Sequence, residues 1–158
     1  MTAQIPETIY FQGKRHALCT EPLEDYFALA GARPDFAPPH TACWRGYVGS
    51  WKILDERLYL TGIRGSTRDG TDVSLETVFP GFPKQVFAHW FCGTLRLPRG
   101  KLLEYEHMGY ASVHEEDLLV DVEKGVVKQV CVRCNGVSHD PNAPDGYGVG
   151  ALTTLRDP

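Results

Sequence analysis

The sequence has no apolar run that approaches the ~20 residues needed to span a bilayer as a helix. Its first residues, Met1–Pro6, show no basic segment followed by an apolar stretch, so a secretory signal peptide is not expected. The chain also lacks an even set of cysteines. Its five cysteines fit reduced thiols in a cytoplasm better than a disulfide framework. These absences predict a cytoplasmic protein with no membrane-spanning segment.

An excess of basic residues is also missing. The 16 Lys and Arg are outnumbered by 20 Asp and Glu, which gives a formal net charge of −4. Proteins that bind the phosphates of nucleic acids usually carry a basic excess. We therefore do not expect a nucleic acid among the partners of this protein.

Complete motifs of known catalytic sites are absent as well. The segments Gly62–Gly65 and Gly146–Gly150 lack the Lys-Ser/Thr ending of a phosphate-binding loop. They also lack the strand-to-helix context of a dinucleotide-binding turn. The chain contains no Gly-x-Ser-x-Gly sequence, which marks the nucleophile of many hydrolases. The sequence therefore favours a non-enzymatic protein that needs no cofactor.

What the chain does contain is a series of short strand patterns separated by turn signals. Apolar and β-branched residues alternate with polar ones over segments typical of half-buried strands. The predicted strand pairs cover residues 9–19, 44–63, 86–108 and 117–134, with turns at Gln12-Gly13, Asp55-Glu56, Pro98–Gly100 and Glu123–Gly125.

One short helix is predicted over residues 22–30. Leu23 and Phe27 share one of its faces, and Gly31 is suited to end it. Many strands and one helix indicate a mainly β protein, with α+β as the alternative class. We expect an antiparallel β-sandwich or a partly open barrel formed by residues 1–134. The loop-rich tail, residues 135–158, packs on that domain or extends from it.

The most distinctive motifs are Trp44-Arg-Gly-Tyr-Val-Gly-Ser-Trp51 and His107-Met-Gly-Tyr110. With Pro22–Phe27, Leu58–Leu60 and Trp90–Pro98, they resemble a family of small uncharacterised bacterial proteins. The resemblance covers most of residues 9–127. It implies a bacterial source, and because such proteins have no established activity, it transfers no catalytic residue.

Charge is distributed unevenly along the predicted strands. Residues 104–124 contain seven Asp or Glu and a single Lys, whereas residues 84–101 contain four Lys or Arg and no acid. Opposed charge patches commonly steer protein partners. Cross-strand ion pairs on a solvated sheet face would produce the same pattern. If the acids face a partner, the binding residues are Glu104, Glu106, Glu115, Glu116 and Asp117.

The same stretch offers acid–base chemistry. A histidine with a carboxylate partner can transfer protons near neutral pH. The candidate catalytic residues are therefore His107, His114 and Glu104. The alternative is that each histidine is a half-buried structural side chain, since no nucleophile or oxyanion-stabilising group accompanies them.

Cys131-Val-Arg-Cys134 has the spacing of half a zinc site. A second pair of ligands at suitable spacing is missing, and positions three apart on a regular strand point to opposite faces. A zinc-stabilised structural module is therefore a third hypothesis, beside ordinary thiols.

Arg45 stands between two aromatic residues, Trp44 and Tyr47. Its guanidinium could stack on an aromatic ring or pair with a buried carboxylate. We expect this arginine to be structural.

The leading hypothesis from the sequence is a protein-binding module, such as an inhibitor or an immunity-type partner of a basic protein. A small enzyme that uses His107 or His114 with a neighbouring Glu is the alternative. A homo-oligomer is compatible with the predicted strands, since an edge strand can pair with a second copy.

Overall fold

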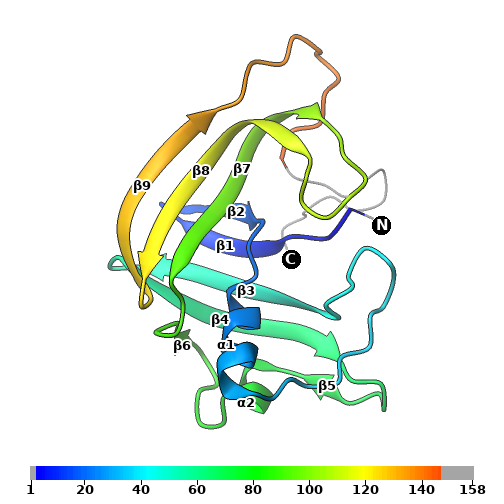
Figure 1. The fold of residues 1–158 in the computed structure, drawn as a ribbon, viewed down its shortest axis with the longest axis vertical. Coiled ribbons are helices and arrows are strands. Elements are labelled where there is room, and N and C mark those ends of the chain that lie inside the picture. Colours follow the sequence, from blue (N-terminus) through cyan, green and yellow to red (C-terminus); the bar gives the residue numbers. More distant parts are fainter. Residues whose placement is uncertain (1–2, 147–158) are drawn as a thin grey trace.

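The computed structural model describes residues 3–146; residues 1–2 and 147–158, which include the end of the predicted tail, lie outside the described part. All of the strands belong to one sheet (Figure 1). In chain order the elements are β1 (Glu7–Phe11), β2 (Lys14–Leu18), α1 (Pro22–Ala30), β3 (Tyr47–Leu54), β4 (Arg57–Ser66), β5 (Asp72–Val73), α2 (Leu75–Val78), β6 (Val86–Phe87), β7 (Gly93–Glu104), β8 (Val113–Glu123) and β9 (Val126–Cys134).

The main path of the sheet runs β2-β1-β3-β4-β9-β8-β7, and β5 and β6 both pair with β4. Neighbouring strands are antiparallel except β1 and β3, which are parallel. The sheet curls until its end strands meet, where Cys19 N donates to Arg96 O of β7 at 2.9 Å, but it is not closed into a barrel. The predicted mainly β class with a short helix at residues 22–30 is confirmed, and the sheet is mixed rather than purely antiparallel.

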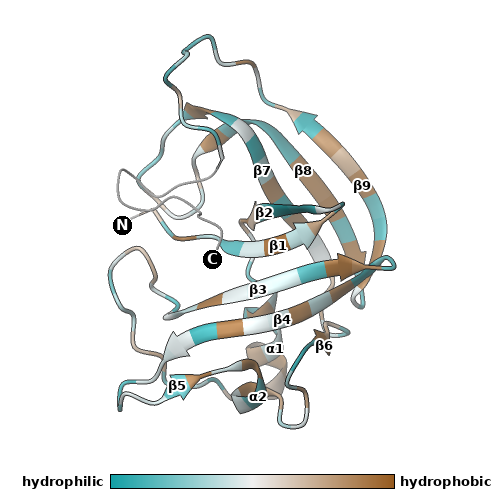
Figure 2. Cartoon of the chain, turned by 180° about the vertical axis from the view of Figure 1, so that it is seen from behind, coloured by the Kyte–Doolittle hydropathy of each residue, from teal (hydrophilic) through white to brown (hydrophobic). Residues whose placement is uncertain are grey.

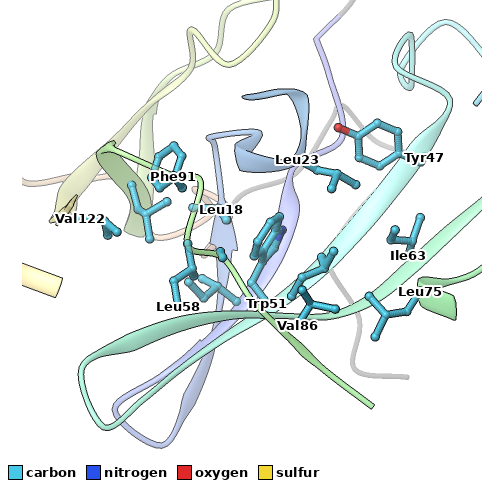
Figure 3. Packing of buried hydrophobic residues seen from close by; sticks show 14 of the residues in the cluster. Leu18, Leu23, Tyr47, Trp51, Leu58, Ile63, Leu75, Val86, Phe91 and Val122 are labelled. Carbon is cyan, nitrogen blue, oxygen red and sulfur yellow. The ribbon is translucent and has the colours of Figure 1, made fainter. Parts of the chain in front are cut away.

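The curled sheet encloses a hydrophobic core. Trp51 of β3 lies at its centre, near Leu18, Leu58 and Val86 (Figure 3). Hydrophobic residues also occur along β4, β7 and β8 (Figure 2). Each 100 Å² of apolar surface removed from water contributes about 2.5 kcal/mol, so this core is the main source of stability.

Helix α1 packs against the part of this core that adjoins β3. Its Phe27 ring lies 6.0 Å from that of Tyr47, between ring centroids and at an edge-on angle, and 6.1 Å from that of Phe36. The helix ends where expected, because Gly31 adopts a left-handed conformation and donates to Phe27 O. The amphipathic pattern of the sequence thus correctly placed this helix on the core.

The turn predicted at Pro98–Gly100 is wrong, because β7 continues through it to Glu104. The backbone N–H and C=O groups of Arg96 are directed away from β8, since its carbonyl oxygen accepts from Cys19 N. Pro98, two residues further along, has the same orientation, so its missing N–H leaves no gap in the ladder with β8. Proline is tolerated in such a position on an end strand of a sheet.

The two halves of the sheet meet at a short junction. β4 pairs with β9 through Arg57 and Val126, and Gly125 adds hydrogen bonds to Leu58 N and Phe91 O. Gly125 has a φ of +80°, and a Cβ atom built on it would lie 2.3 Å from a Phe87 ring carbon. The junction therefore requires glycine for both its conformation and its close contact.

Substitution Gly125→Ala is expected to destabilise the fold by about 3 kcal/mol, since left-handed strain and overpacking each cost roughly 1–3 kcal/mol. Gly13→Ala is the matched control, because Gly13 has a φ of +74° and no atom within 4 Å of the added Cβ. The control should lose only about 1 kcal/mol from strain. Urea unfolding measures both, and equal losses would contradict the steric role of Gly125.

Candidate functional site

Two of the five candidate acidic residues, Glu115 and Glu116, bind groups of β7 and of the segment after β9. Glu115 accepts hydrogen bonds from Lys101 N at 2.7 Å and from Ser138 N at 2.9 Å. These donors lower the pKa of the Glu115 carboxyl. Glu116 forms an ion pair with Arg99 of β7 at 2.7 Å. Both carboxylates therefore have partners within the molecule.

Asp117 is only 1% exposed and lies among three donors. Arg96 Nε approaches at 3.1 Å, Arg133 Nη2 at 2.5 Å and Asn135 Nδ2 at 3.1 Å. Burial opposes ionisation, but these donors outweigh it and hold the pKa of Asp117 below its usual value. Asp117 of β8 thus joins β7, β9 and the segment after β9 rather than facing a partner.

The remaining two, Glu104 and Glu106, are exposed. The acidic stretch is consequently split into an exposed pair at the end of β7 and an internal ion-pair network along β8. Two of the seven acids of residues 104–124, Glu116 and Asp117, form ion pairs with arginines of neighbouring strands, so cross-strand pairing accounts for part of the charge pattern.

Replacing Asp117 with Asn should lower the free energy of unfolding by about 2–3 kcal/mol near neutral pH, since hydrogen bonds to a charged group are lost. A folded-state pKa below the unfolded value gives stability that is present above the unfolded pKa and lost as pH falls through the folded pKa. The difference between wild type and Asp117→Asn should therefore shrink below about pH 4. A difference that is independent of pH would contradict the depressed pKa.

The two candidate catalytic histidines occupy different environments. His107 is exposed, with Nδ1 3.0 Å from Tyr105 OH. His114 is 1% exposed, with Nε2 3.0 Å from Gly146 O, and burial lowers its pKa. Glu104 pairs with Val113 rather than with His114 in the β7–β8 ladder. Glu104 and His114 are therefore not cross-strand partners, and the two histidines differ in exposure.

Cys131 and Cys134 are both exposed on β9. Because the pairing of β9 with β8 is regular from Gln129 to Cys134, side chains three positions apart in this stretch point to opposite faces. Within residues 3–146 no group of three or more His, Cys, Asp or Glu is arranged to hold a metal ion. The geometry therefore gives the zinc hypothesis no further ligand in the described part of the chain.

The structure reveals a buried ion pair that the sequence only half predicted. Arg45 Nη2 binds Glu7 Oε2 at 2.9 Å, and their side chains are 4% and 0% exposed. Glu7 Oε2 also accepts from Gly49 N at 2.5 Å, while Arg45 Nη1 donates to Ile5 O at 2.8 Å. The Arg45 guanidinium lies 5.5 Å from the Tyr47 ring centroid. The expected structural role of Arg45 beside an aromatic ring and a carboxylate is confirmed.

Burial and pairing act in opposite directions on these charges. Burial raises the pKa of Glu7 more than the nearby Arg45 lowers it. For Arg45, burial favours loss of the proton, but Glu7 outweighs it and the pKa rises. Burial also raises the pKa of Tyr47. This cluster therefore depends on the pairing of Glu7 with Arg45 to keep two charges inside the protein.

Four buried polar atoms of this cluster have no hydrogen-bond partner among residues 3–146. They are Glu7 Oε1, Arg45 Nε, Tyr47 OH and Trp51 Nε1. A Cβ on Gly49 would lie 2.6 Å from Glu7 Oε1 and 2.9 Å from Trp51 Nε1, so only glycine admits both groups. Such a cluster costs stability compared with apolar side chains of the same size.

A surface groove of about 540 Å³ adjoins this cluster at Ile5, Cys43 and Tyr47. It lies beside the β3–β4–β5 part of the sheet, next to the segment 37–43. We refer to it as the β3–β5 groove. Its lining residues are Ile5, Ala37, Pro39, His40, Cys43, Gly46, Tyr47, Val48, Ile63, Arg64, Gly65, Ser66, Asp72 and Val73.

Segment 37–43 is fixed at both ends. Ala37 N donates to Ser66 O at 2.8 Å, and Ile5 N donates to Ala42 O at 2.7 Å. Gln4 reinforces the second attachment, since its Nε2 donates to Thr41 O at 2.9 Å. The segment is thereby held against β4 and the N-terminal residues, so one wall of the β3–β5 groove is preformed.

The groove combines apolar and polar side chains. Val48 and Arg64 are cross-strand neighbours on one face of β3 and β4, and Ser66 binds Asp72 at 3.1 Å on the same face. Arg64 is exposed and forms no ion pair or side-chain hydrogen bond within residues 3–146. Its guanidinium is therefore available to a ligand.

Sequence reasoning missed this groove because its lining comes from four separate segments. The strand pair predicted over residues 44–63 ends before Arg64, but Arg64 belongs to β4, which extends to Ser66. Glu7 carried a signal, since an acidic residue opens the otherwise apolar strand Glu7-Thr-Ile-Tyr-Phe11. Its partner Arg45 lies 38 residues further along the chain.

Replacing Arg45 with Met should cost about 3–5 kcal/mol, because Glu7 would become a buried charge without its partner. The loss should be larger near pH 8 than near pH 5. When the folded-state pKa of a carboxyl is raised, the free energy of unfolding falls as pH rises and the carboxyl must ionise inside the protein. The double variant Glu7→Leu/Arg45→Met removes both charges. It should be less destabilised than Arg45→Met, and residue 7 should no longer contribute to the pH dependence of its stability. Urea unfolding across this pH range measures the effect; an Arg45→Met deficit that does not change with pH would contradict it.

Comparison with known proteins assigns no family: no protein-family model, no curated protein and no solved structure matches this chain. The bacterial source therefore stays a prediction from the motifs Trp44–Trp51 and His107–Tyr110. Within residues 3–146, neither helix is long and apolar enough to cross a membrane.

Proposed function

We propose that this chain is a non-enzymatic binding protein that holds a small amphipathic carboxylate in the β3–β5 groove. The observation that carries the proposal is Arg64, an exposed guanidinium that has no partner among residues 3–146 and lies at a groove that is otherwise largely apolar. Small-molecule sites commonly measure about 300–1,000 Å³ and combine apolar walls with a few polar groups. The groove has both properties.

The apolar part of a ligand would lie on the aliphatic side chains of the groove that remain accessible. Ile5 and Val48 are half-buried and Pro39 of segment 37–43 is exposed, whereas Ile63 and Val73 belong to the buried core. Because segment 37–43 is anchored at both ends, this wall needs little ordering when a ligand binds. Preorganisation of this kind reduces the entropic cost of binding.

The charged part of a ligand would pair with Arg64. A guanidinium matches the two oxygens of a carboxylate and binds them through parallel hydrogen bonds. His40 is a second donor on the lining, whereas Asp72 disfavours a further negative group near its own carboxylate. These charges favour a monocarboxylate over a dicarboxylate or a cation.

Binding of a basic protein through the acidic strands has less support. Glu115, Glu116 and Asp117 already have internal partners, and the exposed Glu104 and Glu106 form only a small negative area. The acid–base enzyme has less support still, because His107 and His114 lie in different environments. A cytoplasmic location suits a protein with five free cysteines in its described part.

The test is isothermal titration calorimetry of the full chain with octanoate and 4-phenylbutyrate, two monocarboxylates with an apolar body. Arg64→Gln should weaken binding by roughly 10-fold or more, since a hydrogen-bonded charge contributes about 1.5–3 kcal/mol. Arg68→Gln is the matched control: Arg68 lies two residues beyond β4 and pairs with the exposed Asp35 at 3.2 Å. The control should bind like wild type.

The corresponding alcohol and amine, octanol and octylamine, separate charge recognition from apolar contact. Both should bind at least 10-fold more weakly than octanoate if Arg64 recognises the carboxylate. Equal affinity of Arg64→Gln and Arg68→Gln for octanoate, or the absence of saturable binding by either carboxylate, would overturn the proposal.

A further inference from the structure

Among residues 3–146, nothing pairs with one edge of β9 over most of its length. The pairing of β4 with β9 ends at Val126, and Val127 N still donates to Glu56 O. Beyond this point β9 pairs with β8 alone within the described residues, and residues 128–134 are all exposed. The apolar side chains of Val130 and Val132 are 39% and 47% exposed. Long, open and partly apolar strand edges readily pair with another strand.

The alternation of the β8–β9 ladder shows which backbone groups face this edge. Asn135 N donates to Glu115 O at 2.8 Å, so position 135 is directed toward β8. In an antiparallel ladder this orientation alternates along the strand. Positions 133 and 131 therefore also face β8, whereas the N–H and C=O groups of Val130, Val132 and Cys134 face the open edge.

We propose that a second copy of this chain occupies this edge, through antiparallel pairing of β9 with its counterpart about a two-fold axis. A two-fold axis requires a self-complementary surface, in which residue i meets j and j meets i. The open segment 128–134 has its midpoint at Cys131. A register centred there pairs the whole segment with itself and makes the sheets of the two copies continuous.

In this register the backbone N–H and C=O groups at the open edge find hydrogen-bond partners. The register places Val130 of one copy opposite Val132 of the other, and both positions direct their N–H and C=O groups to the edge. Each of these two symmetry-related residue pairs can therefore exchange hydrogen bonds, as in any antiparallel ladder. Cys131 then forms the central pair without hydrogen bonds, where side chains approach most closely.

The side chains are also compatible with this register. The two Val130–Val132 pairs bury the exposed apolar groups against each other, and β-branched pairs across strands stabilise sheets. Lys128 faces Cys134 and Arg133 faces Gln129, so no two cations meet. Centring the axis on position 128 or 133 would place like charges opposite each other and leave much of the open segment unpaired.

The β9 edge is separate from the β3–β5 groove, whose lining includes no residue of β9. A pair formed through β9 leaves the groove residues out of the contact. The proposal is therefore independent of ligand binding, and failure of either one leaves the other standing.

The first test is sedimentation velocity of the full chain, under reducing conditions, from about 1 to about 200 µM. Wild type should show a concentration-dependent dimer. Val132→Pro removes an N–H that faces the edge rather than β8, so it should keep the fold and raise the dimer dissociation constant at least 10-fold. Val132→Thr keeps that N–H and a β-branched side chain, and should dimerise like wild type.

The second test fixes the register and does not depend on the proline variant. Paired residues without hydrogen bonds have Cα atoms about 4.5 Å apart, which is within the range of a disulfide. The thiol oxidant diamide, which is reduced to a hydrazine as two thiols form a disulfide, should join two copies through Cys131. The double variant Cys92→Ser/Cys134→Ser should give the covalent dimer, and Cys131→Ser should not.

A wild-type chain that stays monomeric over the whole concentration range overturns the proposal. A folded Val132→Pro variant that dimerises as well as Val132→Thr does so too, as does a covalent dimer that persists in Cys131→Ser at wild-type yield.

Discussion

The ion pair between Glu7 and Arg45 holds together the segments on which the rest of this end of the molecule depends. It joins β1 to the turn before β3, and through Ile5 O and Gly49 N it fixes the N-terminal segment and β3 itself. Ile5 in turn binds Ala42 and lines the β3–β5 groove. The shape of the groove therefore depends on two buried charges that lie beneath it.

The buried pair of Glu7 and Arg45 has an energetic cost. Burying a charge pair is rarely more stabilising than burying apolar side chains of the same size. Several polar atoms of the cluster also lack partners among the described residues. The cluster therefore connects strands at a cost in stability, and it lies next to the groove, where Arg45 donates to Ile5 O and contacts the Tyr47 ring.

The curvature of the sheet links the fold to both proposals. β4 and β9 meet over a short junction and then diverge, which leaves β3, β4 and β5 to form one wall with segment 37–43 and leaves β9 with an open edge. The groove and the edge therefore lie on different halves of the same sheet. Gly125, which admits the close contact with Phe87, lies at the junction of these halves.

Local patterns in the sequence predicted the local structure well. Helix α1 over residues 22–30 and β9 over residues 126–134 have their predicted bounds, because capping, turn and alternation signals act over a few residues. The turns at Gln12-Gly13 and Asp55-Glu56 were also placed correctly. Pro98 misled the prediction, since its effect depends on which side of β7 has a neighbour.

The candidate site was less accessible to sequence reasoning because it depends on long-range pairing. Whether Asp117 faces a partner or an arginine is decided by the register of β7, β8 and β9, which the order of charges does not specify. Likewise, Arg64 becomes a groove residue only when segment 37–43 folds beside it. The sequence supplied Arg45 and its aromatic neighbour, but not the carboxylate that pairs with it.

The most direct test of ligand binding in the groove is a backbone amide NMR titration of the full chain with octanoate. Binding in the groove predicts saturable chemical-shift changes of the backbone amides at residues 37–43, 46–48, 63–66 and 72–73. Smaller changes are expected in the N-terminal segment near Ile5. Shifts confined to residues 104–117, or scattered without saturation, would contradict the assignment of the groove as the binding site.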